Sequence, residues 1–121
     1  MVALALVAVV WTGCAHRPVE RPASITIACG DGDFYVTALH WKRWTETEAV
    51  ATGTGRQNDC KPYCAAGRLH TFPLTIRLSR VVQCVPRRRE FSRIAWDGVR
   101  LTGIPKAGSE TLPCSFLKLR P

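Results

Sequence analysis

Apolar and polar residues alternate along the middle of the chain with the period of two that is typical of β-strands. The clearest run lies at residues 68–84, where Leu74, Ile76 and Leu78 alternate with Thr, Arg and Ser. Similar runs predict further strands at residues 24–29, 34–41, 46–56 and 91–96, and a shorter one at 99–102. Near the end of the 46–56 run, Gly53 and Gly55 predict a bulge, or a close approach by another backbone or a large aromatic ring.

Short turns separate these runs. Asp-Gly pairs at residues 31–32 and 97–98 are typical of hairpins, and short connections favour antiparallel neighbours. The pattern therefore predicts a single all-β domain over residues 24–104, built as an antiparallel meander of five or six strands that closes towards a small barrel or sandwich. Prolines and glycines interrupt any regular run beyond it, so residues 105–121 are predicted to form an irregular tail.

The first residues have a different character. A ten-residue apolar run is too short to span a bilayer but suits an export signal, and the sequence T-G-C-A that follows it resembles a bacterial lipobox. We therefore predict an export signal at residues 1–15, with Cys14 acylated as a membrane anchor, and a polar linker at residues 16–23. Ordinary cleavage after Ala15 and a buried N-terminal strand are the alternatives.

The cysteines should then form disulfides, because the chain is predicted to lie outside the cytoplasm. Without Cys14, five cysteines remain, so two bridges and one unpaired thiol are expected. Strand direction in a meander places Cys29 and Cys60 at the same end of the sheet. This predicts a bridge from Cys29 to Cys60 or Cys64. The remaining cysteine of that pair reaches Cys84 only if the cysteine loop folds back over the sheet. The alternative is Cys60–Cys64 with Cys29–Cys84, which would imply a closed barrel.

The net charge of +8 arises from 17 Lys and Arg against 9 Asp and Glu. A basic exported domain is attracted to anionic lipids, wall polymers or other polyanions, whereas it rarely meets nucleic acid. The candidate binding surface combines an aromatic-cationic segment, a rigid polar loop around two cysteines and an arginine-rich turn: Trp41, Lys42, Arg43, Trp44, Asn58, Asp59, Arg87, Arg88 and Arg89. The alternative for the two tryptophans is packing on the sheet, with the cations in water.

Five motifs together resemble a family of small exported proteins from actinobacteria. They are C-G-D-G from Cys29, W-K-R-W from Trp41, A-T-G-T-G from Ala51, N-D-C-K-P-Y-C-A-A-G from Asn58, and L-T-I-R-L-S-R from Leu74. The resemblance covers residues 25–96. It implies an exported domain and no particular activity or catalytic residue. Cys114 lies outside the shared pattern, which makes it the expected unpaired thiol.

Catalytic groups are not recognisable in the sequence, so we assign no catalytic residue and no cofactor. A small hydrolase that uses His40 or His70 with Asp59 or Asp31 is the enzymatic alternative. A zinc site is conceivable from residue type alone, but its spacing is unlike that of common zinc fingers and oxidation competes: Cys60, Cys64, His70 and Cys84. The D-G-D turn lacks the further ligands of a calcium loop, and G-T-G lacks the strand-to-helix setting of a nucleotide site. We therefore assign no metal ligands.

Taken together, these features predict a non-catalytic exported or membrane-anchored protein of the cell envelope that acts as a binding module. Its partner would be an envelope protein or an anionic polymer, with the membrane contacted through the lipid anchor. Binding of anionic lipid or wall polymer by the basic domain is the first alternative, and a small secreted hydrolase is the second.

Overall fold

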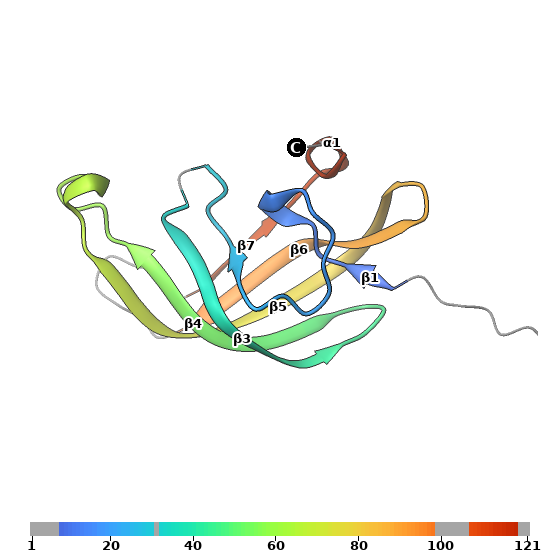
Figure 1. Cartoon of the computed structure of the whole chain (residues 1–121), viewed down its shortest axis with the longest axis horizontal. Helices are drawn as coiled ribbons and strands as arrows, with labels where there is room; N and C mark the ends of the chain where they lie inside the picture. Colours follow the sequence, from blue (N-terminus) through green and yellow to red (C-terminus); the bar gives the residue numbers. More distant parts are fainter. Residues whose placement is uncertain (1–7, 31, 99–106, 119–121) are drawn as a thin grey trace, which may run out of the picture.

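The computed structural model describes residues 8–30, 32–98 and 107–118. Its strands form one curled, mixed sheet with the shape of a half-barrel (Figure 1). The strands are β1 (Val9–Val10), β2 (Ile25–Thr26), β3 (Phe34–Trp44), β4 (Ala49–Asn58), β5 (Leu69–Val85), β6 (Arg88–Gly98) and β7 (Ala107–Thr111). The helical elements are each one turn long: the 3₁₀ turns η1 (Gly13–Ala15) and η2 (Cys64–Ala66), and the helix α1 (Cys114–Leu117).

The predicted all-β meander is confirmed. Strands β3 to β6 pair consecutively and antiparallel, in the sheet order β1-β6-β5-β4-β3-β2, while β7 also pairs with β6. β1 is the exception to the antiparallel pattern, because it lies parallel to β6. The short strand predicted at residues 99–102 lies outside the described residues.

The core fills the concave side of the sheet. The inward face of β5 is fully buried at Ile76 and Leu78, and the alternate residues point to solvent, as the sequence pattern predicts. Gly55 of β4 lies against the ring of Phe72, which a Cβ atom at that position would approach to 2.6 Å. A Cβ atom on Gly53 would lie 2.7 Å from the carbonyl oxygen of Thr37. The predicted close approaches at both glycines are thus confirmed.

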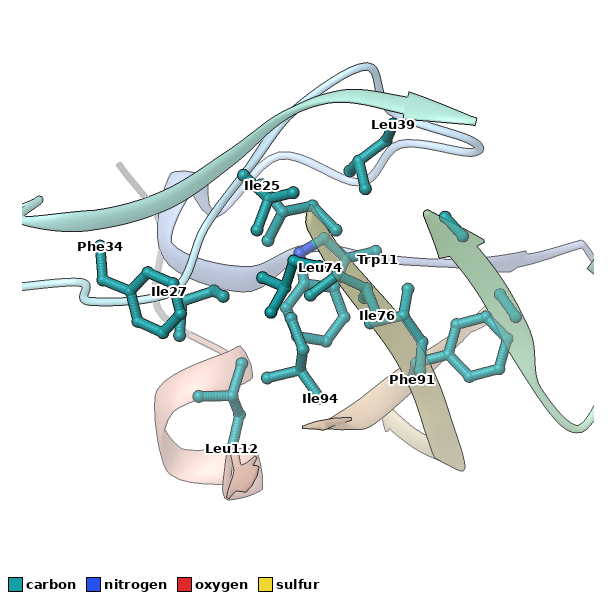
Figure 2. Close-up of a cluster of buried hydrophobic side chains, with 14 of the residues drawn as sticks. Trp11, Ile25, Ile27, Phe34, Leu39, Leu74, Ile76, Phe91, Ile94 and Leu112 are labelled. Carbon is teal, nitrogen blue, oxygen red and sulfur yellow. The ribbon is translucent and has the colours of Figure 1, made fainter. Parts of the chain in front are cut away.

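Part of the predicted export signal belongs to this core in the structure. Val9 is 3% exposed and Trp11 is 5% exposed, and Trp11 exchanges two backbone hydrogen bonds with Val19 of the predicted linker. Figure 2 shows Trp11 among core side chains that include Ile25 and Leu74. This arrangement corresponds to the alternative of a buried N-terminal strand. Export and acylation stay predictions. No helix in the described part of the chain is long and apolar enough to cross a membrane.

The C-terminal region is more regular than the sequence indicates. β7 pairs with the outer edge of β6, where Gly108 leaves room for the ring of Trp96. α1 follows Pro113, and its Leu117 is completely buried. Neither element has a hydrophobic period of its own; both are stabilised by contacts with the sheet.

The disulfides are Cys14–Cys29, Cys60–Cys64 and Cys84–Cys114. The predicted bridge from Cys29 to Cys60 or Cys64 is therefore wrong, as is the unpaired Cys114. The argument from strand direction placed the cysteines at the correct ends of the sheet. Strand direction alone could not show which cysteines lie close enough in the folded protein to form a bridge. Of the alternative connectivity, Cys60–Cys64 is present and Cys29–Cys84 is not.

The Cys14–Cys29 bridge also bears on acylation. A thioether-linked lipid would use the same sulfur atom of Cys14 that the bridge uses, so the Cys14–Cys29 bridge and acylation of Cys14 are mutually exclusive.

Candidate functional site

The cysteine loop, residues 58–70, joins β4 to β5 and is held together by two acidic or amide side chains. The Asn58 Oδ1 atom accepts the backbone N–H of Cys60 at 2.8 Å, and its Nδ2 donates to the carbonyl oxygen of Cys64 at 2.8 Å. The Asp59 Oδ1 atom accepts the N–H groups of Lys61 and Arg68 at 3.1 and 3.0 Å. These contacts hold the polar loop that the sequence predicted to be rigid.

Asp59 also forms a hydrogen bond with His70. Its Oδ2 atom lies 2.9 Å from the His70 Nε2, and the two side chains are 14% and 34% exposed. The hydrogen bond from His70, followed by those from the backbone of Arg68 and Lys61, lowers the pKa of Asp59 to about 2. Asp59 is therefore an anion at any physiological pH. Its hydrogen bond to Nε2 fixes the orientation of the His70 ring.

Of the Asp–His pairs considered for a hydrolase, the structure brings together only Asp59 and His70. His40 is exposed on β3, and Asp31 lies outside the described residues. Within residues 8–30, 32–98 and 107–118, His70 has no hydrogen bond to a hydroxyl or thiol that it could activate. The pair has the geometry of a base and its orienting carboxylate, but no nucleophile among the described residues is hydrogen-bonded to it.

A set of metal-ligand type lies next to the loop. One carboxylate oxygen of Asp33 and the sulfur atoms of Cys60 and Cys64 lie within 4.8 Å of one another. The two sulfurs are bonded to each other, whereas a metal requires the thiolate form. The conceivable zinc set is not assembled, because Cys84 lies at the other end of β5 from His70 and pairs with Cys114.

The two tryptophans of the W-K-R-W segment face the protein interior. The Trp41 indole donates to the carbonyl oxygen of Pro22, and the Trp44 indole donates to that of Val9, both at 2.8 Å. Their rings meet edge to face, with centroids 4.8 Å apart. The packing alternative is confirmed for both residues. Lys42 is exposed to solvent.

Arg43, the remaining residue of this segment, belongs to a surface ion-pair network. It binds Glu48 at 2.8 Å, and Arg77 of β5 also binds Glu48. The hydrogen bond and charge of Arg43, together with the charge of Arg77, lower the pKa of Glu48. The charge of Arg43 is therefore partly neutralised by Glu48.

The arginine-rich turn between β5 and β6 contains two kinds of arginine. Arg88 is structural: its Nε donates to Glu90 and its Nη2 to the carbonyl oxygen of Leu117, both at 2.7 Å, and Glu90 is completely buried. Arg87 and Arg89 form no ion pair with any acidic residue that the structure describes. They are therefore available to bind an external anion.

Lys118 is a third cation at this end of the molecule, and no sequence pattern indicated it because it lies within the predicted irregular tail, residues 105–121. It is exposed and directly follows Leu117, the residue whose carbonyl oxygen binds Arg88. The Cys84–Cys114 bridge fixes α1 beside the turn. We call Arg87, Arg89 and Lys118 the basic end.

The predicted binding surface is thus divided between separate places. The cysteine loop and the basic end lie at opposite ends of β5, as Figure 1 shows. Comparison with models of known families finds no match, and no curated protein or solved structure is significantly similar to this chain.

Proposed function

We propose that this protein is an exported binding module of the cell envelope, and that its basic end binds a phosphate-bearing polyanion. The observation that carries the proposal is that Arg87, Arg89 and Lys118 lie at a turn where the carboxylate of Glu90 is buried and already bound to Arg88. The three disulfides are compatible with a location outside the cytoplasm.

The expected binding strength follows from the number of cations at the basic end. A Lys or Arg near an anionic membrane surface contributes about 1 kcal/mol at physiological salt. Arg87 and Lys118 are exposed and Arg89 is partly buried, so the three residues contribute at most about 3 kcal/mol, which is about a hundredfold in the binding constant. A lipid anchor on Cys14 would be an additional and separate attachment to the membrane.

The test is sedimentation with vesicles of phosphatidylcholine that contain phosphatidylglycerol, and with a soluble poly(glycerol phosphate) as a model wall polymer. We expect Arg87→Gln with Arg89→Gln to weaken binding at least tenfold. The matched control is Arg43→Gln with Arg77→Gln, which removes the same charge from two exposed arginines on the Glu48 network. Equal loss in both double variants would show that net charge, not the basic end, determines binding.

Export is tested separately. If Cys14 is the anchor, radiolabelled palmitate labels the wild-type protein and does not label a Cys14→Ala variant. Equal labelling of the two proteins would contradict lipidation at this residue.

A small secreted hydrolase is the second candidate, and one observation favours it: the 2.9 Å contact between Asp59 and His70. Hydrolysis of ester or amide substrates that disappears in His70→Ala would establish it. Activity that is unchanged in this variant would exclude the pair as its source.

A further inference from the structure

The N-terminal segment, residues 8–12, lies in the structure as an added strand on the sheet. Val9 and Val10 pair in parallel with Arg89 and Glu90 on the outer edge of β6. β7 pairs with the same edge only further along, at residues 93–97. The edge of β6 at Arg89 and Glu90 is therefore covered by the N-terminal segment alone among the described residues.

Side chains of the sheet also recognise this segment. The Trp44 indole donates a hydrogen bond to the Val9 carbonyl oxygen at 2.8 Å, and the Trp44 ring packs edge to face on Phe91 with centroids 5.4 Å apart. The side chains of Val9 and Trp11 enter the core, whereas Val10 between them is only partly buried. Backbone pairing combined with buried alternate side chains is the way in which a sheet edge binds an added peptide strand.

The N-terminal segment does not fill its surroundings completely. An open surface pocket of about 210 Å³ lies on one flank, lined in part by Val9, Trp44 and Glu46. Another of about 220 Å³ is lined in part by Trp11 and Thr12. The Thr12 hydroxyl is buried and has no hydrogen-bond partner in the described part of the chain. A different occupant could therefore make better contacts at the same place.

We infer that the edge site, formed by the β6 edge at Arg89 and Glu90 together with Trp44 and Phe91, binds an extended apolar segment of a partner protein after export. The inference depends on the proposed export, because processing at or after Cys14 would remove the N-terminal segment. Removal would leave the backbone groups of β6, the Trp44 indole N–H and the surrounding apolar side chains uncovered. The chemistry of the present occupant defines the partner: a strand with β-branched and aromatic residues at alternate positions.

The experiment uses the full chain with the N-terminal segment displaced. Val9→Asp places a charge at a position that is 3% exposed, and Cys14→Ser with Cys29→Ser removes the bridge that retains the segment. The probe is a fluorescent hexapeptide with the sequence A-V-V-W-T-G of residues 8–13. We expect the triple variant to bind it at least tenfold more tightly than the wild type, in which the site is occupied.

Two controls make the result specific. The double variant Cys14→Ser with Cys29→Ser, which keeps Val9, should bind the peptide more weakly than the triple variant. A peptide with proline in place of its second valine lacks one backbone donor and should bind at least tenfold more weakly than the original peptide. Equal binding of the two peptides, or equal binding by wild type and triple variant, would overturn the inference.

Circular dichroism of the triple variant verifies its folding. If it is unfolded, Trp11→Ala with the same two serine substitutions replaces it, with the same expected difference between the two peptides. Mass spectrometry of the exported protein tests the other requirement. A mature chain that begins at or beyond Cys14 agrees with the inference, whereas one that retains residues 8–12 overturns it. Neither outcome affects the vesicle assay, which tests the basic end.

Discussion

The two ends of β5 are built in different ways. At one end, the cysteine loop is held by contacts between residues close in sequence: Cys60 and Cys64 are four residues apart, and Asp59 and His70 are eleven apart. At the other end, the basic end depends on distant parts of the chain. Arg88 binds the carbonyl oxygen of Leu117, and the Cys84–Cys114 bridge spans 30 residues.

This difference indicates what each end requires to keep its shape. The cysteine loop contains its own stabilising groups, so it should tolerate loosening of the rest of the domain. At the basic end, Lys118 stays beside the β5–β6 turn only while α1 remains docked on the sheet. Substitutions at the two ends should therefore have unequal effects, and the following experiments measure that inequality in order of expected size.

The largest effect is expected from Arg88→Ala. It leaves Glu90, which is completely buried, without its cationic partner, and breaking a buried pair in this way lowers the free energy of unfolding by about 3–5 kcal/mol. Urea denaturation measures the change. Arg87→Ala on the same turn is the control and should change stability by less than about 0.5 kcal/mol. Similar losses in both variants would show that Glu90 does not depend on Arg88.

The next effect comes from removing, in turn, the two disulfides at the ends of β5. In the chain-entropy model, Cys84→Ser with Cys114→Ser lowers the free energy of unfolding by about 3.6 kcal/mol, against about 2 kcal/mol for Cys60→Ser with Cys64→Ser, because the closed loop is longer. Thermal or urea unfolding of the two double variants gives the comparison. The reverse order would mean that the cysteine loop depends on its bridge more than its other contacts suggest.

The smallest effect is expected from pH. The pKa of Asp59 is lowered in the folded protein to about 2, so the carboxylate contributes stability above its unfolded value of about 3.9, and that contribution is lost as pH falls from about 4 towards 2. In His70→Ala the main cause of the lowered pKa is absent. Acid titration of stability should therefore be less steep for this variant than for the wild type, and identical titrations would remove Asp59 from the explanation.

The same contrast explains how much could be predicted from the sequence. The alternation around Ile76 and Leu78 identified β5 and its buried face, and turn residues identified its antiparallel neighbours. The cysteine loop was also predictable as a rigid turn, because Asn58 and Asp59 bind backbone groups within their own loop. These features depend on residues that are close in sequence or on a simple period.

The features that the sequence did not indicate all require two distant segments to meet. Nothing in residues 107–118 shows that a strand and a helix will dock on β6, and nothing near Cys14 identifies Cys29 as its partner. The acceptors of the Trp41 and Trp44 indoles are likewise backbone carbonyls, which have no residue type to recognise. Lys118 could therefore be assigned to the basic end only in three dimensions.

The parallel pairing of β1 with β6 affects the order in which the sheet can form. Val9 is synthesised 80 residues before its neighbour Arg89, so the first part of the sheet to be made is among the last to be placed. Contacts of such long sequence separation slow folding, because a large loop must close before they form. Pairing of β1 must therefore wait until β6 has been synthesised, and the edge of β6 at Arg89 and Glu90 is uncovered during that interval.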